Sequence, residues 1–326
     1  MTGAAITGVG SALPRTERSS AALEDELGLP PGWIVERTGI RARRVAAADE
    51  SACSLGTAAA RVALERAGLE PSDVDLTIVA TVTPDYRLPS TACLINTALG
   101  ADGSAFDLNA SCTGFLCSLA QADAMVRSGA AMNVLLVGVD LMSRITSGSD
   151  PKTAVLFGDG AGAAVVTAVE GAGRLGPFAF HSDGRQPELL MAASGSGEVV
   201  MAGREVYRRA VQAMVSSVLE VLSPAELPEL RLLVAHQANG RILAAVASRL
   251  DLPEDRVFSN LSKVGNTSAA SIPIALDEAE RSGRMSEGDL IALTAFGAGF
   301  VWGSGLVRWG SHVRPAASEL AGAAHG

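Results

Sequence analysis

Two stretches of 19 residues, SCTGFLCSLAQADAMVRSG at 111–129 and GNTSAASIPIALDEAERSG at 265–283, decide the fold of this chain. Both begin with small residues and end in Arg-Ser-Gly, and Arg127 and Arg281 lie 154 positions apart. Each stretch continues into an apolar run and then into a Gly-rich segment, FGDGAGAAVV in the first case and FGAGFVWGSGLV in the second. Because self-similarity at a fixed offset is the signature of an internal repeat, two related halves are expected.

The repeat also relates residues that carry chemistry. At the offset of 154, Cys112 falls on Asn266. Upstream, the apolar runs IVATVT and LVAHQAN match at an offset of 155, which sets Thr81 on His236. Several matches in the same order favour a duplicated unit over chance similarity between Ala-rich helices. Helix N-termini related by a pseudo-twofold axis face one another, so Cys112, His236 and Asn266 are expected to converge on one cleft.

The pattern of apolar residues predicts short strands that alternate with longer amphipathic helices. The expected helices span residues 51–68, 112–129, 205–222 and 267–283, and the expected strands span residues 76–83, 133–140, 230–235 and 289–295. Such an alternation is typical of an α/β fold. We expect an N-terminal half at 1–170, a C-terminal half at 171–326, and fraying of the Ala- and Gly-rich tail from Ser311.

The chain has 326 residues, and 26 Lys and Arg against 35 Asp and Glu give it a net charge of −9. An acidic balance without a basic tail argues against nucleic acid as a partner. No apolar run reaches the roughly 18 residues that a membrane helix needs, and the N-terminus lacks the pattern of a secretory signal. Four cysteines are too few for a disulfide scaffold. We therefore expect a cytoplasmic protein with reduced thiols and no membrane partner.

Cys112 is the candidate nucleophile, because it follows the strand-like stretch AFDLNA and opens an expected helix. A thiol at a helix N-terminus lies near the positive end of the helix dipole, which should lower its pKa and favour the thiolate. The free N–H groups of the same helix end can bind an oxyanion. The alternative is a buried structural cysteine, which is the role expected of Cys53, Cys93 and Cys117.

His236 and Asn266 are the other candidates for the site. His236 lies in VAHQAN between an apolar strand and a helix, where sites assemble in α/β sheets, and is the best placed of four histidines. A satisfied polar residue is the alternative. Asn266 lies in GNTSAAS at the start of a helix, where Asn commonly acts as an N-cap. Its match to Cys112 in the repeat favours a role in the same cleft.

Three other kinds of site lack their sequence patterns. The chain has no Cys-x-x-Cys or His-x-x-x-His pair, so no metal is expected. The segment GDGAG at Gly158 lacks the spacing of a phosphate-binding loop and continues into a strand-like AAVV, so a tight hairpin beside the site is expected instead. No Gly-x-Ser-x-Gly elbow of a serine hydrolase occurs as a strand–turn–helix unit.

The segments DLNASCTGF, FGDGAGAAVV, HQANGRI, GNTSAAS and AFGAGFVWGSGLVRW together resemble the signature segments of β-ketoacyl-acyl-carrier-protein synthase III, a family of thiolase-fold condensing enzymes. The resemblance runs from about Ile6 to Trp309. It implies a thiolase-like α/β fold, with two duplicated halves in a five-layered α-β-α-β-α arrangement, and a homodimer. It also implies acyl-CoA as a substrate and no permanently bound cofactor.

The resemblance assigns roles to the candidate residues. Cys112 attacks an acyl thioester and becomes acyl-cysteine. His236 and Asn266 donate hydrogen bonds to the malonyl thioester oxygen and stabilise the enolate that decarboxylation leaves, and this carbanion attacks the acyl-cysteine. The backbone N–H groups of Cys112 and Ala298 match the oxyanion hole. Phe296 matches the aromatic residue that favours loss of CO2, and we place it at the acyl pocket.

Trp33 and Arg37 match residues that hold the CoA adenine, Trp33 by stacking and Arg37 by stacking or by binding phosphate. Pro151 stands where many members have an arginine on the other face of the adenine, and Lys152 beside it is an alternative cation. The segment Ala192–Val199 is shorter than in the typical member. These departures leave open an acyl carrier protein as the acyl donor.

Two partners follow from the resemblance. Leu88 precedes Pro89 in a stretch that crosses the dimer in the family and caps the partner's acyl pocket, so Leu88 is expected to influence acyl size. An acyl carrier protein is acidic, and an acidic chain can bind it only through a local basic patch. Arg241 in HQANGR is the best-supported candidate and is also placed at the CoA site. The further candidates for this patch are Arg208, Arg209 and Arg249.

The reaction expected from this resemblance is an acyl transfer that condenses acyl-Cys112 with malonyl-carrier protein, with loss of CO2, to start fatty-acid or polyketide chains. The alternative is a relative that transfers the acyl group to a hydroxyl, an amine or a carrier protein without decarboxylation. The complete set of Cys112, His236 and Asn266 favours condensation and argues against an inactive scaffold. A degradative thiolase would need a second catalytic cysteine near the C-terminal Gly-rich loop, where the chain has none.

Overall fold

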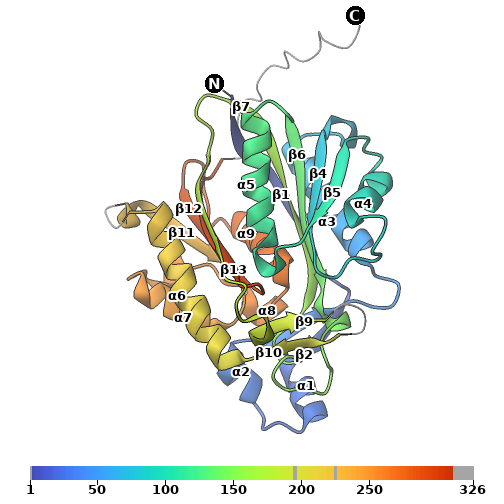
Figure 1. Ribbon diagram of the computed structural model, residues 1–326, viewed down its shortest axis with the longest axis vertical. Coiled ribbons are helices and arrows are strands. Elements are labelled where there is room, and N and C mark those ends of the chain that lie inside the picture. Colours follow the sequence, from blue (N-terminus) through green and yellow to red (C-terminus); the bar gives the residue numbers. More distant parts are fainter. Residues whose placement is uncertain (1, 194–196, 224–225, 311–326) are drawn as a thin grey trace, which may run out of the picture.

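The computed structural model describes residues 2–193, 197–223 and 226–310, so the tail from Ser311 lies outside the described residues. Two mixed sheets build the fold (Figure 1). The first sheet has the strand order β1-β7-β6-β4-β5, with bounds Thr2–Ala12, Asp159–Glu170, Asn133–Leu141, Leu76–Ala80 and Ser104–Leu108. The second has the order β8-β13-β12-β11, with bounds Leu175–Ser182, Val301–Arg308, Leu290–Gly297 and Leu230–Ala235.

The two sheets repeat one topology. In the first sheet β1 and β7 are antiparallel, β7 and β6 are antiparallel, and β6 and β4 are parallel. In the second sheet β8 and β13, β13 and β12, and β12 and β11 follow the same pattern of directions. Among the described strands of these two sheets, only β5, at the edge of the first sheet, has no equivalent strand in the other sheet. The duplication expected from the sequence is therefore confirmed at the level of strand order and direction.

Helices fill three layers around the two sheets (Figure 1). The outer face of the first sheet is covered by α3 (Ala52–Ala67) and α4 (Thr91–Leu99), and the outer face of the second by α6 (Gly203–Val221) and α7 (Gly240–Arg249). Between the sheets lie α5 (Gly114–Arg127) and α9 (Ser271–Arg281), and one buried cluster joins their side chains to strands of both sheets. The order helix, sheet, helix, sheet, helix is the five-layered arrangement that the resemblance implies.

Smaller elements gather at the lower end of the molecule in Figure 1. The ribbon of β2 (Thr16–Ser19) and β3 (Ala42–Val45) leads into and out of α1 (Ser20–Leu27) and α2 (Trp33–Thr38). A second antiparallel pair is formed by β9 (Leu190–Ala192) and β10 (Val199–Met201), and α8 spans Leu261–Val264. Of the short segment expected at Ala192–Val199, residues 194–196 lie outside the described residues.

The two central helices begin later than expected. Each is preceded by a 3-10 turn, η2 (Ser111–Thr113) before α5 and η7 (Ser268–Ala270) before α9. The first residue of each turn is a serine with a left-handed backbone, with φ of 49° at Ser111 and 50° at Ser268. Such a φ is uncommon for a residue other than glycine. These two serines are therefore structurally equivalent.

This equivalence corrects the expected alignment of Cys112 with Asn266. Both central helices end in arginine at the predicted offset, but α5 has 14 residues and α9 has 11. The offset therefore grows from 154 at the helix ends to 157 at their starts, and the counterpart of Cys112 is Ala269. The match of Thr81 to His236 remains, because each is the first residue after an equivalent strand.

The tight hairpin expected at GDGAG is wrong, because β7 is one long strand from Asp159 to Glu170. Its glycines serve helix packing. A Cβ atom on Gly162 would lie 2.6 Å from the backbone nitrogen of Ile274 in α9. Any side chain there would therefore push the central helix off the sheet.

The division of the chain at residue 170 stays a prediction. The last strand of the first sheet ends at Glu170, and the first strand of the second sheet starts at Leu175. In the described part of the chain, no helix has both the length and the apolar character needed to cross a bilayer.

Candidate active site

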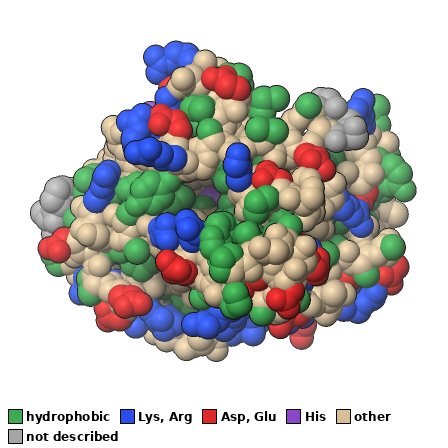
Figure 2. Space-filling model, turned by 90° about the horizontal axis from the view of Figure 1, so that it is seen from below, with side chains coloured by type: hydrophobic (Ala, Val, Ile, Leu, Met, Phe, Trp, Pro, Cys, Tyr) green, Lys and Arg blue, Asp and Glu red, His purple; other side chains and the backbone are tan. Residues whose placement is uncertain are grey.

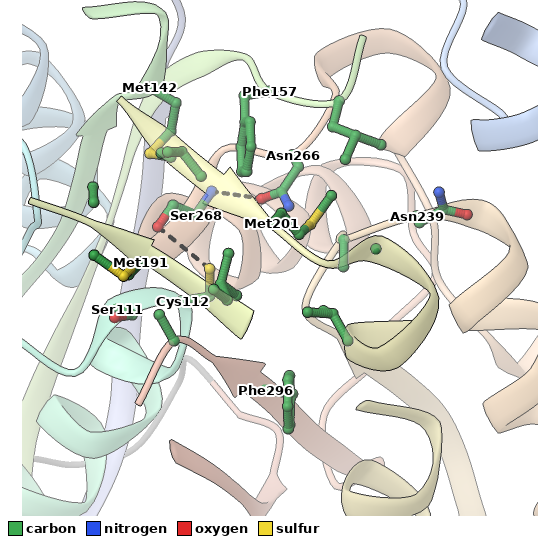
Figure 3. Close-up of a pocket in the computed structure, with 18 of the residues that line it drawn as sticks. Ser111, Cys112, Met142, Phe157, Met191, Met201, Asn239, Asn266, Ser268 and Phe296 are labelled. Atoms are coloured by element: carbon green, nitrogen blue, oxygen red, sulfur yellow. Dashed lines mark hydrogen bonds between the residues drawn. The ribbon is translucent and has the colours of Figure 1, made fainter. Parts of the chain in front are cut away.

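A cavity of about 1380 Å³ lies at the end of the molecule where the small elements gather. Cys112, His236 and Asn266 all line it, so the convergence expected from the sequence is found. Figure 3 shows Cys112 and Asn266 within the cavity, with Ser268 between them. From below, Figure 2 shows a hollow edged by hydrophobic, Lys and Arg side chains.

Cys112 lies in the η2 turn, two residues before α5 begins at Gly114. Its Sγ atom is 3.5 Å from the hydroxyl oxygen of Ser268. The pKa of the thiol is raised to about 11, chiefly by burial and also by the negative charge of Asp140, while the hydrogen bond to Ser268 acts in the opposite direction. The lowered pKa expected from the sequence is therefore wrong, because the effect of burial outweighs that of the helix terminus.

His236 follows β11 directly and is almost fully buried. Its backbone N–H donates to the Thr294 carbonyl over 2.8 Å, and its Nδ1 lies 2.6 Å from the hydroxyl oxygen of Ser271. The same hydroxyl oxygen accepts the backbone N–H of Gln237 over 3.3 Å, so its proton is free to point at Nδ1. In the tautomer whose Nδ1 accepts this proton, the ring proton is on Nε2.

Burial also fixes the charge of this ring. It lowers the pKa of His236 to about 4, so the imidazole is neutral at pH 7. A neutral ring with its proton on Nε2 is a hydrogen-bond donor that carries no net charge.

Asn266 precedes the η7 turn and is buried. Its backbone is tied to the strand-like segment at Phe157, because its N–H donates to the Leu156 carbonyl over 2.9 Å and its carbonyl accepts the Gly158 N–H over 3.0 Å. Its side-chain oxygen accepts the backbone N–H of Ser268 over 2.9 Å. With the oxygen engaged, the amide NH2 is the part of the side chain that can donate into the cavity.

The loop between β12 and β13 closes the other side of the nucleophile. Phe296 and Ala298 line the cavity, and the Phe296 ring packs 4.8 Å from the ring of Phe300, measured between centroids. Gly297, which lies between Phe296 and Ala298 in the sequence, faces the turn that holds Cys112. A Cβ atom on Gly297 would lie 2.9 Å from the backbone nitrogen of Cys112. The backbone of this loop and that of the η2 turn therefore meet at one point.

The mouth of the cavity holds the residues expected to bind CoA. The Arg37 guanidinium carbon lies 4.5 Å from the centre of the Trp33 ring, and Arg241 donates to the Glu36 carbonyl over 3.3 Å. Among the described lining residues there is no carboxylate, and the lining cations are Arg37, Arg87, Lys152, Arg204 and Arg241. A cavity with five cations and no opposing acid attracts an anionic ligand.

The remaining expected contacts lie outside this cavity. Leu88 is 87% exposed and does not border the cavity of its own chain, in the part of the chain that the structure describes. Arg208 and Arg209 share the carboxylate of Glu205, at 2.6 and 3.0 Å. Arg249 is exposed at the end of α7.

Sequence reasoning missed three polar residues that surround the site. Ser268 contacts Cys112 and Ser271 contacts His236. The fully buried Asp140 accepts hydrogen bonds from the backbone N–H of Ala269 in the η7 turn and from that of Val82 after β4. The only signal for Asp140 is its position as the sole acid at the end of the apolar run NVLLVGVD. The two serines sit in GNTSAAS without any spacing that marks them. Among the described residues no cluster could hold a metal ion.

Two sheets of one topology, with a cysteine just before a central helix, are the arrangement of the thiolase-like condensing enzymes. Family models agree with this class: 3-oxoacyl-[acyl-carrier-protein] synthase III matches residues 106–184, and its C-terminal model matches residues 224–309.

Similar proteins extend the match to nearly the whole chain. β-Ketoacyl-[acyl-carrier-protein] synthase III of Sphingopyxis alaskensis is 46% identical over 94% of this chain and 98% of its own length. The crystal structure of 3-oxoacyl-[acyl-carrier-protein] synthase III from Aquifex aeolicus superposes with a TM-score of 0.91 at 44% identity, over 94% of this chain and 100% of that one.

A priming β-ketosynthase of the R1128 polyketide pathway superposes with a TM-score of 0.89 at 37% identity, over 93% of this chain and 95% of that one. The chain belongs to the β-ketoacyl-[acyl-carrier-protein] synthase III family. It is an acyltransferase, and its reaction is the condensation that initiates fatty-acid biosynthesis.

Proposed function

We propose that Cys112 is the nucleophile that accepts the acyl group from acyl-CoA. The sulfur forms a bond to the acyl carbonyl carbon, the bond to the CoA sulfur breaks, and the proton of the Cys112 thiol leaves with the CoA thiol. Two points support this role: the thiol borders the cavity, and it lies in the segment DLNASCTGF, whose resemblance to the family implies a nucleophile at this position. The carbonyl oxygen of the acyl group becomes negative in this step and needs hydrogen-bond donors.

The backbone N–H groups of Cys112 and Ala298 are the donors that we assign to this oxyanion. Cys112 lies in the first turn before α5, where backbone N–H groups lack helical partners. The close approach of Gly297 to the Cys112 nitrogen supports the pairing of the two loops. Preorganised backbone donors act without reorganisation when charge develops.

The condensation step is assigned to His236 and Asn266. Both side chains are neutral donors that border the cavity, and both can donate to the thioester oxygen of a malonyl group. When the malonyl carboxylate leaves as CO2, its electron pair forms an enolate whose charge collects on that oxygen. The carbanion then bonds to the acyl carbon, and Cys112 leaves as a thiolate. Phe296 offers an apolar wall against the departing CO2.

The acyl donor is bound at the mouth of the cavity. We assign the adenine to a stack on Trp33 and the phosphates to the basic residues beside it, Arg37 and Arg241. Lys152 borders the same mouth and is the cation nearest in sequence to Pro151, so we propose that it supplies the charge that an arginine supplies elsewhere in the family.

Partners follow from the same proposal. A homodimer would bring the exposed Leu88 of one chain to the acyl pocket of the other. For the acidic carrier protein, Arg241 and Arg249 are better docking residues than Arg208 and Arg209, because the latter two are already paired with Glu205. The cytoplasm is the compartment that fits this set of partners.

The start of a polyketide chain is a second role for the same condensation. It is supported by the structural match to a polyketide-priming ketosynthase. Fatty-acid and polyketide initiation use the same two half-reactions and differ in the starter group that the cavity accepts.

The convergence of Cys112, His236 and Asn266 on one cavity is the observation that carries the proposal. Its test is intact-protein mass spectrometry after incubation with acyl-CoA. The native chain is expected to gain one acyl group, and Cys112→Ala is expected to gain none. Cys117→Ala is the matched control, since Cys117 lies in the first turns of α5, five residues after Cys112, and also has a raised pKa, yet does not line the described cavity. An adduct that persists in Cys112→Ala would contradict the nucleophile assignment.

A further inference from the structure

Ser268 is a cavity residue that the reaction described above does not use. It is buried, with 1% of its surface exposed, and it lines the cavity at the start of the η7 turn. Its hydroxyl oxygen lies 3.5 Å from the Sγ atom of Cys112, the contact drawn as a dashed line in Figure 3. The nucleophile thus faces a hydroxyl group from the opposite half of the duplicated fold.

The position of this hydroxyl is fixed by the backbone around it. The Ser268 N–H donates to the side-chain oxygen of Asn266 over 2.9 Å, and the Ala269 N–H donates to the Asp140 carboxylate over 3.1 Å. The backbone of Ser268 is left-handed, with φ of 50°. A serine is not favoured in that conformation, so surrounding contacts hold it there.

Asp140 lies behind this serine at the end of β6 and is fully buried. Its carboxylate accepts from the hydroxyls of Thr81 and Thr83, each over 3.1 Å, and from the Val82 N–H over 2.7 Å. The Ser268 hydroxyl also interacts with this carboxylate. The hydroxyl therefore lies between a thiol and a carboxylate that has other donors.

We propose that the Ser268 hydroxyl stabilises the Cys112 thiolate by donating its hydrogen bond to the sulfur. A serine hydroxyl can rotate about its C–O bond and can both donate and accept. With Cys112 as a thiol, the S–H donates to Ser268 and the hydroxyl donates to Asp140. When the thiol loses its proton, the hydroxyl turns to the sulfur, and Asp140 keeps its remaining donors.

The need for such a donor follows from the charges around the thiol. Burial raises the pKa of Cys112 to about 11, and the negative charge of Asp140 acts in the same direction. His236 lines the same cavity but is neutral and supplies no positive charge, and the lining Arg and Lys residues do not shift the pKa of the thiol. The elements packed on the η2 turn (α5, η7, β12 and β13) place no other charged side chain against it among the described residues. Of the described side chains, only Ser268 lowers the thiol pKa by a hydrogen bond.

The inference rests on the proposed role of Cys112 and predicts a measurable loss of thiolate. A hydrogen bond to a charged group is worth enough to change the thiolate fraction by about 10- to 100-fold. We expect Ser268→Ala and Ser268→Gly to slow alkylation of Cys112 by iodoacetamide by that factor at each pH from 7 to 10. Peptide mass spectrometry separates Cys112 from the other three thiols.

The two variants separate chemistry from folding. Glycine adopts a positive φ without strain, so Ser268→Gly is expected to melt at or above the native temperature while losing the hydroxyl. Ser111 is the matched control, because it is also a serine with φ of 49° and lines the same cavity. Ser111→Gly is expected to leave the rate and pH profile of Cys112 alkylation unchanged.

Two results would overturn the inference. One is an alkylation profile of Ser268→Gly that superposes on the native profile, and the other is an equal slowing in Ser111→Gly and Ser268→Gly. If the proposed function were wrong, the native chain itself would form no acyl adduct on Cys112. That outcome is distinct from both results above.

Discussion

Gly297→Ala adds one methyl group at the point where the β12–β13 loop meets the nucleophile. The new Cβ would lie 2.9 Å from the Cys112 nitrogen, 3.2 Å from the Ser111 Cβ and 3.4 Å from the Thr113 nitrogen. These atoms belong to the turn itself and not to the end of a flexible side chain. The turn or the loop must therefore move by several tenths of an ångström.

The expected cost has two parts. Overpacking of this kind lowers the free energy of unfolding by about 1–3 kcal/mol. The same movement displaces the sulfur and one of the two N–H groups that we assign to the oxyanion, and loss of one such donor slows a reaction by about 10²- to 10³-fold. Gly297→Ala should thus remain folded at 25 °C but acylate Cys112 at least about 100-fold more slowly than the native chain.

The assay is the rate of acyl-adduct formation, followed by quenched-flow mass spectrometry, with urea unfolding on the same samples. Gly203→Ala is the matched control: Gly203 lines the same cavity, but a Cβ on it would meet only the Met201 Cε at 3.7 Å. An acylation rate of Gly297→Ala within about threefold of the native rate would refute the assigned geometry, since a lost oxyanion donor costs far more than that.

Three further predictions follow from the site. The pKa of His236 is 6.5 in the unfolded chain but about 4 in the folded one. The free energy of unfolding should therefore be unaffected by this group above pH 6.5 and should fall by about 3 kcal/mol as the pH drops to 4. Urea unfolding of the native chain and of His236→Gln at pH 7 and pH 4 measures this loss, and an equal pH dependence in the two proteins would contradict it. His236→Ala should still form the acyl adduct on Cys112 but release no CO2 from malonyl-carrier protein, and CO2 release near the native rate would contradict the role of the ring. Trp33→Ala should raise the KM for acyl-CoA about 10-fold, as expected for loss of a stacked base. The KM for an acyl-pantetheine, which has no adenine, should not change. An equal rise in KM for both donors would show that the adenine does not stack on Trp33.

The sequence predicts much of this fold because its repeat is visible along the chain. The strand at 230–235 has the predicted bounds, and the alternation of helices and strands follows from the apolar pattern. The starts of α5 and α9 were not predictable, because the 3-10 turns before them depend on a left-handed serine backbone that no residue preference signals. The same three-residue difference moved the counterpart of Cys112 from Asn266 to Ala269.

The three candidate residues of the site were predictable from the sequence, but the direction of the pKa shift of Cys112 was not. Cys112, His236 and Asn266 each stand at a strand or helix end, where sequence reasoning looks for sites. The pKa of Cys112 depends on how deeply the turn is buried and on Asp140, which is 28 positions away in the sequence and reaches the site through the sheet. The contact between Ser268 and Cys112 joins the two halves across 156 residues, the hydrogen bond between Ser271 and His236 joins residues 35 positions apart in the second half, and only the folded chain brings these groups together.

We propose that this chain joins acyl-Cys112 to a malonyl group with loss of CO2. The most direct measurement loads the native chain with an acyl group from acyl-CoA, adds malonyl-carrier protein, and counts CO2 released per acyl group lost from Cys112. We predict one CO2 for each acyl group, with the β-ketoacyl product on the carrier protein. Acyl groups that leave Cys112 for the carrier protein without CO2 would contradict the claim and establish simple acyl transfer.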